Sequence, residues 1–491
     1  MKKIFAIAAL VIAGTTIATA QQPDAEYQLL RYRYTVNADG TTDYNVRKEV
    51  RFIRNRAITA YADKGETFIV YDPQYETLTI NESYTLRPDG SRVATPDNAF
   101  VEQLPGNCTN CGRFNHLREL AIVHTALEYN AVTVLDYTIH RSSDLLCGRL
   151  QTVQDCPIDR LEIELVVPSN QELSVNLLKS QFVDINPRVS QTPYSYKLTA
   201  TNVPQTFVAP YLPDAEVLYP TLIFYNGTPQ YKPEFEQERL PQAAATIVNL
   251  AGETPTATAI NLRNFVADNI HLNDIPADML GYTHATAAET WNSGCGTHTD
   301  RAVLLAAMLR TAGLQASVYG HDYTRVAVII DTMEYDVTPD AKPATLPLIG
   351  EAHDLVSTVN VNNTVDAQLE TLEGGYYRYT IPTEPGAMQP LLAALTPSRT
   401  APLQLRPCDE TYSYTVKLPK GMKMVGKQVD ETRNFGDLGK VSVSIKQSGS
   451  KLKIKRHLNI DKDIVSGDDY NHLRQMLAVW ESHRQVIFKQ K

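Results

Sequence analysis

Beyond its first twenty residues, the 491-residue sequence has no apolar run that approaches the length of a membrane-spanning helix. It has no internal repeat and no low-complexity segment, and its 24 glycines and 28 prolines are too few to indicate disorder. Basic residues are not in excess, because 46 Lys and Arg face 55 Asp and Glu, for a formal charge of −9. These absences argue against a membrane span and against nucleic acid as a partner.

The one long apolar run lies at the N-terminus, in MKKIFAIAALVIAGTTIATA. Lys2 and Lys3 precede it, and it ends in the small residues Ala18, Thr19 and Ala20. This order is typical of a secretory signal peptide. We therefore expect residues 1–20 to be removed, and a protein that is periplasmic or secreted. No cysteine follows the cleavage site, which argues against a lipid anchor.

Cysteine is scarce, and in an oxidising compartment an even number favours disulfides. The six cysteines are Cys108, Cys111, Cys147, Cys156, Cys295 and Cys408. Cys147 and Cys156 bracket a short loop between predicted strands and could pair. NCTNCG has CxxC spacing, but no βαβ pattern surrounds it, which favours a small structural disulfide or two thiols. A zinc site built from the first four cysteines is the alternative, although the second pair lacks CxxC spacing. We expect no cofactor.

Alternating patterns indicate a β-rich first half. In AVTVLDYTIHR, apolar residues such as Leu135 and Ile139 alternate with polar ones such as Asp136 and His140. LEIELVV repeats the alternation. Period-two patterns predict antiparallel strands with one buried face, and many strands at short spacing predict a sandwich. We therefore expect an antiparallel β-sandwich over residues 21–232.

Helical spacing replaces this pattern in the centre of the chain. GCGTHTDRAVLLAAMLRTAGL has an apolar stripe, a candidate N-cap at Thr297 with Asp300 three residues later, and Gly313 at its end. Three predicted strands follow, so residues 233–345 should form an α/β core. Residues 346–491 read as a linker and a C-terminal β-sandwich with a terminal amphipathic helix. The fold class is thus α+β and multidomain.

The stretch GTHTDRAVLLAAMLRTAGL and the two strand motifs after it resemble the nucleophile helix and next strands of the transglutaminase-like superfamily, whose core is papain-like. The segments YDPQYETLTINESYTLRPDGSRVATPDNAF and FNHLRELAIVHTALEYNAVTVLDYTI resemble domain of unknown function 3857. That domain often precedes such a core in exported proteins of Bacteroidetes. The resemblance covers most of the mature chain.

In the register of this resemblance, the family's catalytic Cys, His and Asp fall on His298, Arg325 and Thr338. The family needs a thiolate at a helix N-terminus, a histidine base and a carboxylate that orients the histidine. A neutral imidazole is a poor substitute for the thiolate. Arg325 cannot act as a base, and Thr338 cannot stabilise an imidazolium as a carboxylate does. The register therefore predicts an exported protein that has lost catalysis and binds a peptide, glycan or protein.

Two alternatives use Cys295, three residues before the nucleophile position. In the first, Cys295 is the nucleophile of an amidase, peptidase or acyltransferase, with His321 and Asp322 as base and orienting group. In the second, Cys295 and His298 bind a metal ion, most naturally zinc, together with His321, Asp322 or His284. The simpler interpretation is that Cys295 is buried or disulfide-linked, with Cys408 as a candidate partner.

Overall fold

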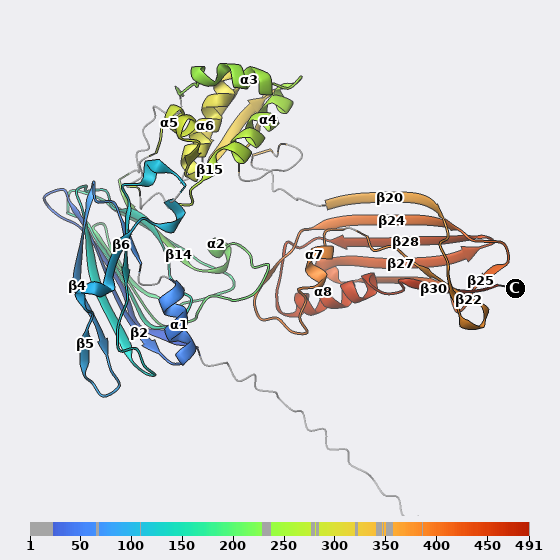
Figure 1. The fold of residues 1–491 in the computed structure, drawn as a ribbon, viewed down its shortest axis with the longest axis horizontal. Helices are drawn as coiled ribbons and strands as arrows, with labels where there is room; N and C mark the ends of the chain where they lie inside the picture. Colours follow the sequence, from blue (N-terminus) through green and yellow to red (C-terminus); the bar gives the residue numbers. More distant parts are fainter. Residues whose placement is uncertain are drawn as a thin grey trace, which may run out of the picture.

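The computed structural model describes residues 23–490, except 65–67, 109, 228–236, 276–279, 281–283, 320–322, 340–345, 347, 350–356 and 385. The expected signal peptide lies outside the described residues. Figure 1 shows three bodies along the chain: a β domain in blue to green, a small helical core in green and yellow, and a second β domain in orange and red. The structure is therefore an α+β, multidomain fold, as expected.

An eight-stranded sheet forms the framework of the N-terminal domain, in the order β12-β13-β10-β1-β2-β8-β4-β5. Its strands are β1 (Ala25–Val36), β2 (Thr42–Phe52), β4 (Glu76–Leu86), β5 (Arg92–Ala94), β8 (Val132–Arg141), β10 (Ile158–Val166), β12 (Arg188–Thr192) and β13 (Ser195–Val203). The pairs are antiparallel except β1 and β10, which run parallel. The expectation of antiparallel strands is therefore wrong for LEIELVV in β10 and its neighbour β1, because alternation follows from which face is buried and not from strand direction.

Two smaller sheets pack on the large sheet and complete the sandwich. They are β11-β14-β9, with strands Leu173–Leu178, Thr221–Asn226 and Cys147–Gln151, and β3-β7-β6, with strands Ile69–Tyr71, Arg118–Ile122 and Phe100–Gln103. Leu222 of β14 and Leu161 of β10 belong to one buried apolar cluster, while Ile69 and Leu135 belong to another. Two short helices, α1 (Asn55–Lys64) and α2 (Ala215–Leu218), complete this domain.

Helix α6 (His298–Thr311) is the centre of the core, and every residue from Thr299 to Arg310 is buried. It packs on β17 (Gln315–Tyr319) and β18 (Arg325–Ile330), which form an antiparallel sheet with β19 (Met333–Asp336). Helices α3 (Ala244–Leu250), α4 (Pro255–Asn269) and α5 (Ala287–Ser293) surround it, and β15 (His271–Leu272) pairs with β16 (Cys295–Gly296). The expected packing of this helix on the sheet is confirmed (Figure 1).

Both ends of α6 follow from local sequence. The Thr297 side chain accepts a hydrogen bond from the Asp300 N–H, and the Asp300 side chain accepts one from the Thr297 N–H, which is the expected capping box. At the other end Gly313 has a φ of +85°, the left-handed conformation that glycine adopts without strain. The predicted bounds of the helix are therefore confirmed to within a residue.

Two further sheets, with a helix against one of them, form the C-terminal domain. The larger sheet has the order β20-β24-β28-β27-β26, and the smaller has the order β21-β22-β30-β25. The strands are β20 (Ser357–Asp366), β21 (Glu370–Leu372), β22 (Tyr376–Thr380), β24 (Cys408–Lys417), β25 (Met422–Met424), β26 (Val429–Asn434), β27 (Gly439–Ser448), β28 (Lys451–Ile460) and β30 (Gln485–Gln490), with β23 (Leu403–Gln404) pairing β29 (Ile464–Val465). Helix α8 (Gly467–Trp480) packs on β27, and α7 (Gln389–Leu392) is a single turn. The expected helix is α8, and β30 follows it.

None of the helices within the described residues has both the length and the apolar character that crossing a membrane requires. The N-terminal and C-terminal domains touch through backbone groups, since the Gln404 N–H donates to the Tyr211 carbonyl at 2.8 Å. The Arg399 guanidinium also donates to the Pro210 carbonyl at 2.7 Å. The Tyr211 hydroxyl donates to the Pro390 carbonyl at 3.2 Å as well.

His124, in the N-terminal domain, makes stability depend on pH. Its side chain is buried beside the Thr95 hydroxyl, and this burial lowers its pKa to about 4. The unfolded chain binds a proton near pH 6.5, whereas the folded protein does not until about pH 4, so this group's contribution to stability falls as pH falls through that window. Denaturant titrations of the full chain should show a loss on the order of 3 kcal/mol between pH 7 and pH 4 that His124→Gln does not show. The exposed His472→Gln is the control, and equal pH slopes for the parent and His124→Gln would contradict the assignment.

Candidate functional site

The turn before α6 holds Cys295 in a fixed place. Gly294 ends α5 with a φ of +65°, and the next two residues form β16 beside β15. A Cβ at Gly296 would lie 2.7 Å from the Cβ of Asp300, so this close turn requires glycine. Cys295 is therefore buried below the first turn of α6, three residues before His298.

The Cys295 sulfur is bonded to Cys111, which lies 184 residues earlier in the N-terminal domain. The two Cα atoms are 5.9 Å apart, and both side chains are buried. The candidate pairing of Cys295 with Cys408 is wrong, because Cys408 is a buried thiol in β24 of the C-terminal domain. In this form Cys295 has no thiol, so it supplies neither a nucleophile nor a metal ligand.

The other cysteine expectations also change. Cys147 and Cys156 are buried thiols rather than a disulfide, so the expected bond between them is wrong. The four-cysteine zinc site is wrong as well, because Cys111 is in the disulfide. Across the described residues, no group of three or more His, Cys, Asp or Glu side chains could hold a metal ion. His321 and Asp322, proposed as partners of Cys295, lie outside the described residues.

Cys111 lies in a segment of the N-terminal domain that contacts the core. We call it the docking segment, and it consists of residues 106–108 and 110–117. The segment lies between β6 and β7 and includes two short 3-10 turns. Figure 1 shows it in cyan, reaching toward α5 and β15. Its side chains form one buried apolar cluster with side chains of the core. Cys108, Cys111, Phe114 and Leu117 come from the segment, and Ile275, Leu280 and Cys295 come from the core. The Asn107 side-chain amide donates to the Asp274 carbonyl, and the Asn273 side-chain amide donates to the Asn107 carbonyl, at 2.8 Å each.

The carboxylate of Asp300 joins the docking segment to the start of α6. This side chain is fully buried. One oxygen accepts the Ala285 N–H at 2.6 Å, and the other accepts the Thr297 N–H at 2.9 Å and the Arg113 guanidinium at 2.5 Å. A buried carboxylate needs such partners, because an uncompensated charge in the interior is costly. Arg113 therefore neutralises the group that caps α6.

A second polar cluster lies where β17, β18 and β19 meet. The Asp336 carboxylate accepts a hydrogen bond from the Tyr319 hydroxyl at 2.6 Å and one from the Thr338 N–H at 2.8 Å, and Arg325 lies 2.9 Å away. Burial alone would raise the pKa of Asp336, but these hydrogen bonds and the arginine charge outweigh it and hold the pKa below its usual value. The same contact, together with burial, raises the pKa of Tyr319.

The resemblance predicts His298, Arg325 and Thr338 as the triad positions, and the structure brings two of them to one carboxylate. Arg325 and Thr338 meet at Asp336, and the Thr338 hydroxyl also accepts the Val326 N–H at 3.1 Å. His298 begins α6, and its Nε2 lies 3.6 Å from a carboxylate oxygen of Asp274. The Arg310 side chain donates to the Ala316 carbonyl at 2.9 Å, so β17 begins beside the C-terminal end of α6, and β18 returns antiparallel to β17.

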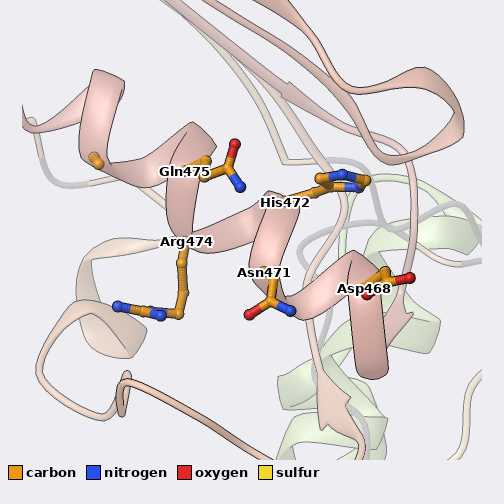
Figure 2. Close-up of a pocket in the computed structure, with 6 residues that line it drawn as sticks. Asp468, Asn471, His472, Arg474 and Gln475 are labelled. Carbon is orange, nitrogen blue, oxygen red and sulfur yellow. The ribbon is translucent and has the colours of Figure 1, made fainter. Parts of the chain in front are cut away.

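A hollow of ≈ 530 Å³ lies in another part of the molecule, on the solvent face of α8. Figure 2 shows the side chains that line it. It is lined by Asp468, Asn471, His472, Arg474, Gln475 and Ala478. All six come from one helix of the C-terminal domain, and the labelled side chains point outward in different directions. The hollow therefore does not coincide with the start of α6 or with the Asp336 cluster.

Comparisons with known proteins agree with this architecture. Residues 38–206 match a domain of unknown function with a solved structure, DUF3857, as the sequence resemblance predicts, and residues 386–487 match a second such domain, DUF3858. A crystal structure from Parabacteroides distasonis ATCC 8503, described as a "putative protease", matches with a TM-score of 0.76 and 21% identity. The match covers 95% of this chain and 99% of that one. At this identity the likeness shows the fold alone.

Two further comparisons add little. An M1 zinc metallopeptidase from Deinococcus radiodurans matches with a TM-score of 0.19 and 12% identity, over 59% of this chain and 64% of that one, and carries no argument. A comparison with curated proteins gives no match.

Sequence reasoning missed two of the residues that matter most here. Asp336 stands two residues before Thr338, so the strand pattern could have placed both on one face. Arg113 had no comparable signal, because its partner Asp300 lies 187 residues away and only the folded structure brings them together.

The buried pair of Arg113 and Asp300 leads to a stability prediction. Asp300→Asn keeps the shape of the side chain but leaves the guanidinium without its counter-charge, so the unfolding free energy should fall by about 3 kcal/mol. Asp274→Asn is the matched control, because that carboxylate is 86% exposed and should change stability by less than about 0.5 kcal/mol. Denaturant titration measures both, and hydrogen exchange should report faster opening of the docking segment only in Asp300→Asn. Equal effects of the two substitutions would show that the buried pair is not a structural tie.

Proposed function

We propose that this protein is an exported, non-catalytic member of the transglutaminase-like superfamily that binds a peptide, glycan or protein ligand with its core. The observation that carries the proposal is the bond between the Cys295 and Cys111 sulfurs. This bond removes the thiol of Cys295, which would be the nucleophile of the enzyme alternative. The first residue of α6, where the resemblance expects the nucleophile, is His298, so the helix begins with an imidazole and not with a thiol.

The remaining triad positions support the same conclusion. The guanidinium of Arg325 has hydrogen-bond donors but no acceptor, and it is paired with Asp336. The hydroxyl of Thr338 is engaged with the Val326 N–H. Neither group can accept a proton from a nucleophile or orient a histidine in the way that acyl transfer requires.

Export is supported by two independent features. The N-terminal sequence has the form of a signal peptide, and the disulfide joins two domains through buried sulfurs. Disulfides of this structural kind form and persist in oxidising compartments such as the periplasm. We therefore place the protein in the periplasm or outside the cell.

The group best suited to ligand binding is Arg325. Its side chain is 57% exposed, and its guanidinium lies 5.6 Å from the Tyr319 ring centre. One N–H of the guanidinium meets Asp336, and a planar fork of five donors can bind a second acceptor such as a carboxylate or sugar hydroxyl. The buried carboxylate holds the arginine in place, so little side-chain entropy remains to be lost on binding.

The loss of catalysis can be tested by activity assays on the purified protein. Peptidase, amidase and transglutaminase assays on unselected peptide substrates should give no turnover above that of Cys295→Ser. The same result is expected after reduction of the disulfide, since no base and orienting carboxylate replace the family's pair. Turnover that disappears in Cys295→Ser and persists in His298→Ala would instead establish a cysteine enzyme centred on Cys295.

Binding can be tested with arrays of synthetic peptides and bacterial glycans. Arg325→Ala should weaken binding of any positive probe at least tenfold, about 1.4 kcal/mol, because it removes a charged hydrogen-bond donor. Arg433→Ala is the matched control, since Arg433 is 55% exposed and pairs with Glu431 in the C-terminal domain. Equal affinities of the two variants would remove Arg325 from the binding site.

A further inference from the structure

Three cysteines, not two, lie in the buried cluster between the docking segment and the core. Cys108 belongs to the same apolar cluster as Cys111 and Cys295 and remains a thiol. The N–H of Cys111 donates to the carbonyl of Cys108 at 3.2 Å, which closes a tight turn between them. Turns of this kind bring the first and fourth Cα atoms to less than about 7 Å, within the range that a disulfide can bridge.

We propose that Cys108, Cys111 and Cys295 form a thiol–disulfide exchange centre, in which Cys108 replaces Cys295 as the disulfide partner of Cys111. The Cys108 thiol loses its proton to solvent, and the thiolate attacks the Cys111 sulfur. A bond forms between Cys108 and Cys111 while the bond between Cys111 and Cys295 breaks, and Cys295 leaves as a thiolate that takes up a proton. The number of disulfides is unchanged, so the step needs no oxidant or reductant.

Exchange would change how the two domains are joined. The bond from Cys111 to Cys295 crosses from the N-terminal domain to the core, whereas a bond from Cys108 to Cys111 lies within the docking segment. After exchange only non-covalent contacts hold the segment down, chiefly Arg113 on Asp300 and the amide of Asn107. The inference goes beyond ligand binding and does not depend on which ligand the core takes.

The surroundings of Cys108 set the speed of this exchange. The side chain is almost fully buried, and burial, aided by the charge of Glu119, raises the pKa of the thiol to about 11. Thiolate is therefore scarce at neutral pH, and the cross-domain disulfide persists. Opening of the docking segment would expose Cys108 to solvent and favour its thiolate. The rate of exchange therefore depends on whether the segment is docked on the core.

Alkylation of the oxidised full-length protein tests the exchange directly. The protein is incubated with iodoacetamide at pH 7 and pH 8 without reductant, and peptides are mapped by mass spectrometry without reduction. We expect the label to accumulate on Cys295 together with a bond between Cys108 and Cys111, about tenfold faster at the higher pH. Cys108→Ser should abolish this labelling, and Cys408→Ser, which removes a buried thiol of the C-terminal domain, should leave it unchanged.

Three outcomes would overturn the exchange centre: no label on Cys295, label on Cys108 with the original disulfide intact, or equal labelling of Cys295 in Cys108→Ser. A second variant gives an independent test if Cys108→Ser does not fold. In Cys295→Ser, oxidised glutathione should produce a bond between Cys108 and Cys111. Two alkylatable thiols after that treatment would also reject the proposal. These readouts are disulfide maps, so their failure is distinct from any activity found in the catalytic assays.

Discussion

The buried carboxylate of Asp300 is the group on which both the start of α6 and the docking of the N-terminal domain depend. It completes the capping box of Thr297 and receives the guanidinium of Arg113 from a segment almost two hundred residues earlier. A carboxylate in the interior is tolerated only with charged and hydrogen-bonding partners. The cap of α6 and the docking of the N-terminal domain therefore stabilise each other. The ion pair already favours contact between the docking segment and the core, and the disulfide between Cys111 and Cys295 links the two covalently.

The proposed loss of catalysis rests on the polar groups of the core and not on its fold. A helix N-terminus, an antiparallel sheet and a buried carboxylate are all present, yet the carboxylate of Asp336 holds an arginine instead of a histidine. Arg325 therefore has a fixed position and a partly exposed charge, which are properties of a binding group. The proposed function follows from this difference in chemistry, since the fold alone is compatible with an enzyme.

Features that arise from neighbouring residues could be predicted from the sequence, and features that arise from distant ones could not. The bounds of α6 follow from Thr297, Asp300 and Gly313, and the strands after it follow from their alternation, so the core was predictable. The partner of Cys295 was not, because six cysteines allow many pairings and spacing does not distinguish them. Arg113 could not be identified either, because its partner Asp300 is distant in the sequence and the two meet only when the domains pack together.

The disulfide also has a consequence for the order in which the chain can mature. Its two cysteines are 184 positions apart in the sequence. In the chain-entropy model, closing so long a loop destabilises the unfolded state by about 5 kcal/mol. In the export that we propose, the N-terminal end emerges first, so Cys108 and Cys111 would reach the oxidising compartment together, long before Cys295. The earliest bond available to Cys111 is thus with its near neighbour, and the native cross-link requires that this bond either not form or be rearranged once the core has arrived.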